Sequence, residues 1–93
     1  MTSNAIGPDV YAKFMEMVSR MNDMKQSSYN PGDQAVLYMY ARYKQAMQGD
    51  VIGARPNGFL HPIARKKWDA WNELRGMSSQ QAMIQYIQYG TRL

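Results

Sequence analysis

Residues 33–50 of this chain read DQAVLYMYARYKQAMQGD, and this stretch decides the fold. Val36, Tyr40, Tyr43 and Met47 recur at three- and four-residue spacing, which is the period of an α-helix and places them on one stripe. Gly49-Asp50 then interrupts the pattern. The stretch therefore predicts a helix from Asp33 to Gln48.

Three further helices are predicted on either side of this one. They cover residues 8–24, residues 62–76 and the residues from about 79 to the C-terminal end. Pro8 and Pro62 suit the first position of a helix, Gly76 suits the C′ position, and Ser78 begins a capping-box pattern with Gln81. The polar segment 25–32 and the glycine- and proline-containing segment 51–61 are expected to be connections.

Each of these helices also carries a predicted apolar face. On the first it consists of Tyr11, Phe14, Met15, Val18 and Met21, on the third of Ile63, Lys67, Ala70, Trp71 and Leu74, and on the fourth of Ala82, Met83, Tyr86, Ile87 and Gly90. No strand pattern of useful length and no internal repeat interrupts them. The sequence thus predicts an all-α, four-helix fold.

The composition favours binding over catalysis. The chain has 93 residues, enough for one domain over residues 1–93, with no cysteine and one histidine. Because catalytic dyads, triads and transition-metal sites need more such groups, we expect no catalytic residue, no metal and no cofactor. His61 is interpreted as the end of a loop, and Asp69 with Glu73 as a solvated helix face.

Other features indicate a cytoplasmic protein. The longest apolar run, from Ala35 to Ala41, is far shorter than the ~20 residues that span a bilayer. Residues 1–8 lack the basic and apolar regions of a signal peptide, and the absence of cysteine fits a reducing compartment. The net charge of +4 favours an anionic partner.

Five polar residues lie on or beside helical faces that should be apolar: Tyr40, Tyr43, Lys44, Lys67 and Tyr86. One interpretation is that the lysines extend to the rim and the tyrosines keep their hydroxyls in water. The other is that an anionic ligand meets the lysines, because a buried ammonium is costly without one. If the faces converge, these residues form a half-aromatic, half-cationic cup that suits a nucleotide.

Several motifs resemble those of one known family. They are YARYKQA at residues 40–46, Gly49-Asp50, Arg55-Pro56, KWDAW at residues 67–71, Leu74, Gly76, Ser78, and Ala82-Met83 followed by Tyr86-Ile87. Over about residues 10–93 the chain resembles the acyl-CoA-binding protein (diazepam-binding inhibitor) family, and the order and spacing of the motifs match from Asp33 onward. The combination of YxxYKQA with KWDAW is highly specific.

The resemblance implies a four-helix bundle of up-down-down-up topology that binds medium- to long-chain fatty acyl-CoA esters without covalent chemistry, as an intracellular carrier and pool former. It implies that Tyr43 packs against the adenine of CoA. It also implies that Lys44 and Lys67, with the Tyr40 hydroxyl, hold the 3′-phosphate of the ribose. Tyr86 would line the site near the adenine and ribose.

The rest of the implied site is apolar. Trp68 would border the ligand, and Val36 and Leu37 would form the wall of the second helix under the acyl chain. The expected partners are fatty acyl-CoA esters, with no nucleic acid, at most transient membrane contact and a monomeric state.

The sequence departs from the family pattern at several places. The loop from Lys25 to Asn30 is longer than in compact members, and Asn57 is an extra residue after Arg55-Pro56. Ser19 and Ile63 stand where some members have ligand-contacting lysines, so those two contacts are not carried over. Gly90 replaces a larger apolar residue, which is expected to loosen the seam between the first and fourth helices.

The alternative from a different class is a small, basic, helical module that binds nucleic acid or another protein. Its support is weak, because the basic residues are spread over several helices and are not collected on one recognition helix. Strongly salt-dependent binding to DNA or RNA would favour it.

Overall fold

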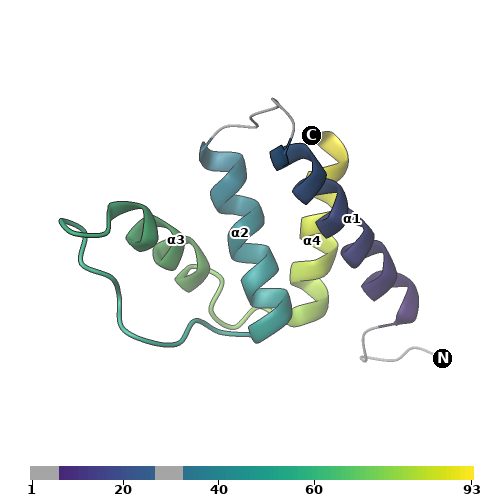
Figure 1. Ribbon diagram of the computed structural model, residues 1–93. Helices are drawn as coiled ribbons and strands as arrows, with labels where there is room; N and C mark the ends of the chain where they lie inside the picture. The colour runs from purple at the N-terminus through teal and green to yellow at the C-terminus, as the bar shows by residue number, and fades with distance from the viewer. Residues whose placement is uncertain (1–6, 27–32) are drawn as a thin grey trace.

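The computed structural model describes residues 7–26 and 33–93, and within these ranges it holds four α-helices and no strand (Figure 1). The helices are α1 Pro8–Gln26, α2 Asp33–Gln48, α3 Pro62–Asn72 and α4 Ser79–Arg92. In Figure 1, α1 and α4 run upward, α2 runs downward, and α3 descends obliquely on the other side of α2. The predicted all-α, up-down-down-up bundle is confirmed.

Most helix boundaries follow the predicted signals. α2 has its predicted bounds, and the Ser78 side chain caps α4 by accepting a hydrogen bond from the Gln81 N–H at 3.1 Å. α1, however, continues past residue 24 to Gln26. Lys25 then lies in its last turn, where a positive charge stabilises the helix dipole. The longer loop predicted from Lys25 to Asn30 thus starts after Gln26, and residues 27–30 lie outside the described ranges.

The predicted end of the third helix was wrong by about one turn. α3 ends at Asn72, and the chain then continues in a tighter turn. The Leu74 N–H donates to the Trp71 carbonyl at 3.0 Å and the Arg75 N–H to that of Asn72 at 3.1 Å, which are the i to i−3 bonds common at helix ends. Gly76 still has the left-handed conformation expected of it, with φ of +92°.

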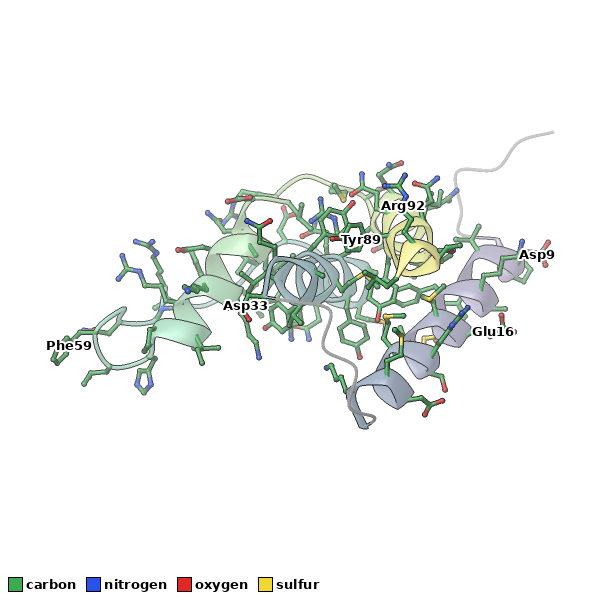
Figure 2. The ribbon with its side chains drawn as sticks, turned by 90° about the horizontal axis from the view of Figure 1, so that it is seen from above. Asp9, Glu16, Asp33, Phe59, Tyr89 and Arg92 are labelled. Atoms are coloured by element: carbon green, nitrogen blue, oxygen red, sulfur yellow. The ribbon has the colours of Figure 1, made fainter. Side chains whose placement is uncertain are left out.

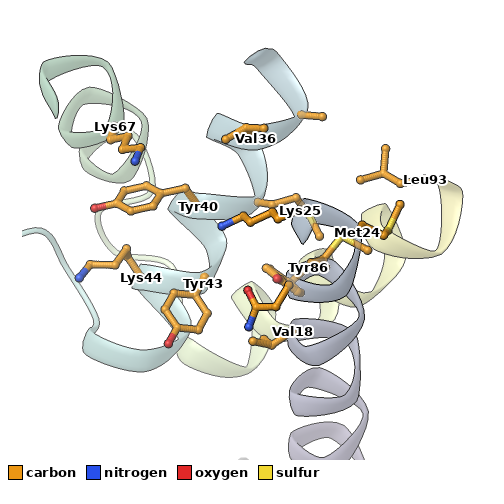
Figure 3. Close-up of a pocket in the computed structure, with 14 residues that line it drawn as sticks. Val18, Met24, Lys25, Val36, Tyr40, Tyr43, Lys44, Lys67, Tyr86 and Leu93 are labelled. Carbon is orange, nitrogen blue, oxygen red and sulfur yellow. The ribbon is translucent and has the colours of Figure 1, made fainter. Parts of the chain in front are cut away.

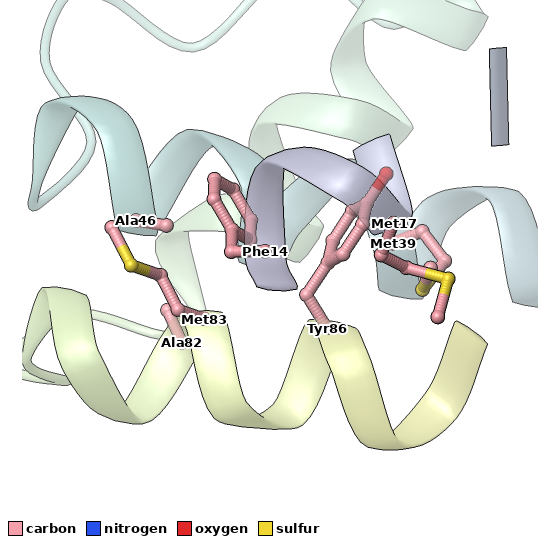
Figure 4. Packing of buried hydrophobic residues seen from close by; sticks show 7 residues of the cluster. All are labelled: Phe14, Met17, Met39, Ala46, Ala82, Met83 and Tyr86. Carbon is pink, nitrogen blue, oxygen red and sulfur yellow. The ribbon is translucent and has the colours of Figure 1, made fainter. Parts of the chain in front are cut away.

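α2 is the central helix of the bundle, because it packs against both α3 and α4, while α1 packs against α4. A first hydrophobic cluster joins α1, α2 and α4 and consists of Phe14, Met17, Met39, Ala46, Ala82, Met83 and Tyr86 (Figure 4). A second joins α2 to α3 and to the segments before and after it, through Ala41, Val51, Trp71 and Leu74. α2 is therefore buried on two sides.

This double burial corrects the predicted apolar stripe of α2. Val36 and Met47 are 36% and 44% exposed, because the stripe lies between the two buried faces. Tyr11 on α1 and Ile63 on α3 are likewise 47% and 68% exposed, and Met17 is buried on α1. The face predicted for α4 holds well, with Ala82, Met83, Tyr86 and Gly90 buried.

Gly90 lies buried where α4 passes α1. A Cβ atom at this position would come within 2.6 Å of the Met17 Sδ and 3.2 Å of the Met39 Cε. The missing side chain thus lets two methionines pack onto the backbone of α4. The seam between α1 and α4, which we expected to be loose, is closely packed.

A network of hydrogen bonds, here called the polar junction (Gln45, Asp50, Gly76 and Met77), joins the end of α2 to the turn before α4. The fully buried Gln45 donates from Nε2 to the Asp50 carboxylate at 2.9 Å and to the Met77 carbonyl at 2.8 Å. The same Asp50 oxygen accepts from the Gly76 N–H at 2.7 Å. These donors, the Gly76 N–H above all, hold the pKa of Asp50 below its usual value.

We predict that Gln45→Ala lowers the free energy of unfolding by about 2–4 kcal/mol, because it removes two buried hydrogen bonds and leaves a cavity. Urea denaturation followed by circular dichroism measures this loss. Gln48→Ala is the matched control, since Gln48 is an exposed glutamine on the same helix. Equal denaturation midpoints for the two variants would contradict a structural role for the junction.

Candidate functional site

The candidate functional site is a cavity of about 410 Å³ on one face of the bundle (Figure 3). This volume lies in the range of small-molecule pockets. All four helices and the C-terminal residue contribute to its lining, which consists of Val18, Met21, Asn22, Met24, Lys25, Ala35, Val36, Met39, Tyr40, Tyr43, Lys44, Lys67, Tyr86 and Leu93.

The charged side chains that line the cavity are all positive. Lys25 comes from α1, Lys44 from α2 and Lys67 from α3, and none of the 14 lining residues is acidic. The described part of the chain has one salt bridge, between Arg55 and Asp69 at 2.8 Å, and no lining lysine takes part in it. The cavity is therefore suited to an anion that can meet several ammonium groups at once.

Two of these ammonium groups lie over aromatic rings. The Lys67 Nζ is 5.3 Å from the centre of the Tyr40 ring, and the Lys44 Nζ is 5.0 Å from the centre of the Trp71 ring. Cation–π attraction thus positions both lysines without neutralising their charge. Figure 3 shows Tyr40, Tyr43 and both lysines gathered at one end of the cavity.

The aromatic floor of the cavity is continuous with the core. Phe14 stacks on Tyr43, with ring centres 6.2 Å apart, and meets Tyr86 edge-on at 5.1 Å. Tyr86 is only 5% exposed. Burial, with a smaller contribution from Tyr43, raises the pKa of Tyr86 from 10.0 to about 12, so this hydroxyl is neutral at physiological pH.

The remaining wall of the cavity is apolar and rich in methionine. Val18, Met21 and Met24 face it from α1, and Val36 and Met39 from α2. Methionine side chains are flexible and polarisable, so they fit apolar ligands of varied shape. The cavity thus has a cationic, aromatic end and an apolar wall.

The structure brings together six of the eight residues proposed from the sequence, namely Val36, Tyr40, Tyr43, Lys44, Lys67 and Tyr86. Leu37 and Trp68 do not line the cavity, because each is turned by about 100° around its helix from a lining neighbour. Trp68 packs against the second cluster, and its indole N–H is buried with no hydrogen-bond partner among the described residues. Ligand contact by these two side chains stays a prediction.

Lys25 is the notable residue that the sequence reasoning missed. Ending the first helix at residue 24 left Lys25 in the loop, whereas α1 carries it into the cavity lining. The sequence does contain a signal for this placement, because Lys25 follows Val18 and Met21 at helical spacing.

The fold and the cavity define a helical domain that binds an amphipathic anion, and comparison with known proteins specifies the class. The sequence pattern of the family described as "Acyl CoA binding protein" matches residues 11–90. The chain belongs to the acyl-CoA-binding protein family. This confirms the resemblance found in the sequence and gives no support to the nucleic-acid or protein-interaction alternative.

Individual relatives agree with this assignment. Human acyl-CoA-binding domain-containing protein 4 is 44% identical over 81 residues, which cover 86% of this chain and 30% of that protein. Acyl-CoA-binding domain-containing protein 5 of Xenopus laevis is 48% identical over 63 residues, which cover 68% of this chain and 13% of that protein. The chain thus spans less than a third of the length of these relatives.

Solved structures of the family have the same fold. The crystal structure of Oryza sativa acyl-CoA-binding protein 2 superposes with a TM-score of 0.81 at 32% identity, covering 91% of this chain and 88% of that one. That of the acyl-CoA-binding protein from Moniliophthora perniciosa gives 0.79 at 31% identity, covering 85% and 74%.

The described residues lack two further features. They contain no group of three or more histidine, cysteine or acidic side chains placed to hold a metal ion. No helix within residues 7–26 and 33–93 combines the length and apolar character that a membrane crossing requires.

We predict that the protein loses stability as the pH rises from 10.0 toward about 12. The unfolded state releases the Tyr86 proton at a lower pH than the folded state does. The contribution of the neutral Tyr86 hydroxyl to the free energy of unfolding is therefore fully present below pH 10.0 and is lost by about pH 12. The loss is at most about 3 kcal/mol. Urea denaturation at a series of pH values measures it.

Tyr86→Phe should reduce this alkaline loss, because it removes the titrating group. Tyr11→Phe, which removes a hydroxyl from an exposed tyrosine, is the control. If the Tyr86→Phe and wild-type proteins lost stability in parallel above pH 10, burial of the Tyr86 hydroxyl would not be the cause.

Proposed function

We propose that this chain forms one acyl-CoA-binding domain over residues 1–93 and carries medium- to long-chain fatty acyl-CoA esters in the cytoplasm as a monomer. The observation that carries the proposal is the cavity itself, where lysines from three helices meet tyrosine rings beside an apolar wall. Fatty acyl-CoA has the same three parts: phosphates, a purine and an alkyl chain.

The cationic end of the cavity would bind the CoA head group. Lys44 and Lys67, with the Tyr40 hydroxyl, would hold the 3′-phosphate, and the half-buried ring of Tyr43 would pack against the adenine. Tyr86 would border the ribose and adenine from the floor. Its closeness to Phe14 means that it supports this surface as part of the core as well.

The apolar wall would hold the acyl chain. Val36 and the methionines of α1 and α2 line this side of the cavity. At about 0.8 kcal/mol for each buried methylene, ten methylenes contribute about 8 kcal/mol before ordering costs. CoA alone and free fatty acid should therefore each bind far more weakly than the ester.

We predict that Lys67→Ala weakens palmitoyl-CoA binding by about 1.5–3 kcal/mol, or about tenfold to 150-fold in Kd, because it removes a charge-assisted bond to the 3′-phosphate. Isothermal titration calorimetry measures the affinity. Lys66→Ala is the matched control, because Lys66 is an exposed neighbour that does not line the cavity. It should change Kd less than about twofold.

A second ligand tests which group of the acyl-CoA Lys67 contacts. Palmitoyl-dephospho-CoA lacks the 3′-phosphate, so its binding to the wild-type protein should be much weaker, and Lys67→Ala should add little further loss. The two changes then form a double-mutant cycle with a coupling energy well above zero. Independent, additive losses would show that Lys67 acts elsewhere on the ligand.

The binding requires no covalent step, no cofactor and no metal, so we propose a carrier without turnover. A sample incubated with palmitoyl-CoA should release no CoA thiol above the rate in buffer. A thiol-reactive dye measures this release, and excess CoA that scales with protein concentration would reject the carrier assignment.

A further inference from the structure

The end of the segment between α2 and α3, together with the first turn of α3, carries an apolar tip that consists of Phe59, Leu60 and Ile63. Their side chains are 91%, 65% and 68% exposed, and a cluster of exposed large apolar residues is informative where a single one is not. Figure 2 shows Phe59 at the extreme end of the molecule, pointing away from all four helices. The tip is separate from the cavity, since none of the three residues lines it.

The backbone of this tip is held by specific hydrogen bonds. The Asn57 Oδ1 accepts from the Phe59 N–H at 2.8 Å and from the Leu60 N–H at 3.2 Å, and the Asn57 carbonyl accepts from the His61 N–H at 2.8 Å. Asn57, an extra residue by comparison with the family pattern, thus builds the turn that presents the two apolar side chains.

The surroundings of the tip are cationic. Residues 51–68 contain four lysines and arginines and no acidic residue. Arg55 is neutralised by its two hydrogen bonds to Asp69, both 2.8 Å long. Lys66 is exposed, and the stem of Arg65 packs so closely on the turn that a Cβ at Gly58 would lie 2.8 Å from the Arg65 Cδ. Neither Arg65 nor Lys66 forms a salt bridge within the described residues, although the charge of Arg65 acts on Asp69. Two positive side chains thus follow Ile63 closely on the first turns of α3.

We propose that the apolar tip docks the protein onto the surface of an anionic lipid bilayer. Phe59 and Leu60 would enter the interfacial region of the bilayer, while Arg65 and Lys66 meet the lipid phosphates. The tip is a convex projection, which suits insertion between lipid head groups, and the complementary charge selects an anionic surface. This inference goes beyond acyl-CoA binding and does not depend on it.

Docking through the tip would also orient the cavity. Ile63 and Lys67 are four residues apart and thus lie on one face of α3, one turn from each other. If the proposed function holds, the phosphate-binding end of the cavity would lie about one helical turn from the membrane surface. The acyl-CoA would then enter and leave close to the lipids.

Vesicle flotation of the full chain, without acyl-CoA, tests the proposal. The wild-type protein should float with phosphatidylcholine vesicles that contain about 30 mol% phosphatidylserine, and much less with phosphatidylcholine alone. Phe59→Ser combined with Leu60→Ser should weaken binding to anionic vesicles at least about tenfold. Lys66→Gln should weaken it about fivefold, and raised salt should weaken the wild type.

Tyr11→Ser is the matched control, because Tyr11 is an exposed aromatic residue on α1. It should float like the wild type. Flotation of the Phe59/Leu60 variant at the wild-type level, or no flotation of the wild type, would overturn the proposal. The proposal would also be overturned if the wild-type protein did not float but formed a dimer, and the double substitution converted this dimer to a monomer. The tip would then be a surface for contact with protein.

Calorimetry on the same variants separates this proposal from the proposed function. The Phe59/Leu60 variant should bind palmitoyl-CoA with the wild-type Kd in solution, since neither residue lines the cavity. Its thermal unfolding should match the wild type, because both side chains are exposed.

Discussion

The arrangement of the bundle depends on the buried amide of Gln45. By donating to both Asp50 and the Met77 carbonyl, this side chain fixes the end of α2 against the turn that leads into α4. The Trp71 indole N–H, which donates to the Gly49 carbonyl at 2.8 Å, attaches α3 to the same end of α2. α3 is thereby held at the angle that brings Lys67 to the cavity.

Much of the fold could be predicted from the sequence, because local signals dominate the helix ends. Ser78 and Gly76 identify a cap and a left-handed turn, and α2 has its expected bounds. The faces of the helices were harder to predict. A helix that is buried on one side has one apolar stripe, but α2 is buried on two, so Val36 and Met47 fall between its contacts and remain exposed.

The site residues that could be predicted are polar side chains at positions where the helical pattern predicts an apolar one. Lysine and tyrosine on apolar faces identified Tyr40, Lys44 and Lys67, and all three line the cavity. Residues whose participation depends on tertiary placement escaped this reasoning. Lys25 lines the cavity because α1 continues to Gln26, two residues past the predicted end at residue 24. Trp68 is turned toward a second core that only the packing of α3 on α2 creates.

The methionine-rich wall has a consequence for ligand range. A partly buried methionine such as Met21 can change rotamer at little cost, so in the proposed function the wall would adjust to alkyl chains of different length and select weakly among them. The same thioether groups make the wall sensitive to redox state. Oxidation to the sulfoxide would turn this apolar surface into a polar one. The proposed contacts with the acyl chain would then weaken, whereas the proposed contacts of Lys44 and Lys67 with the head group would remain.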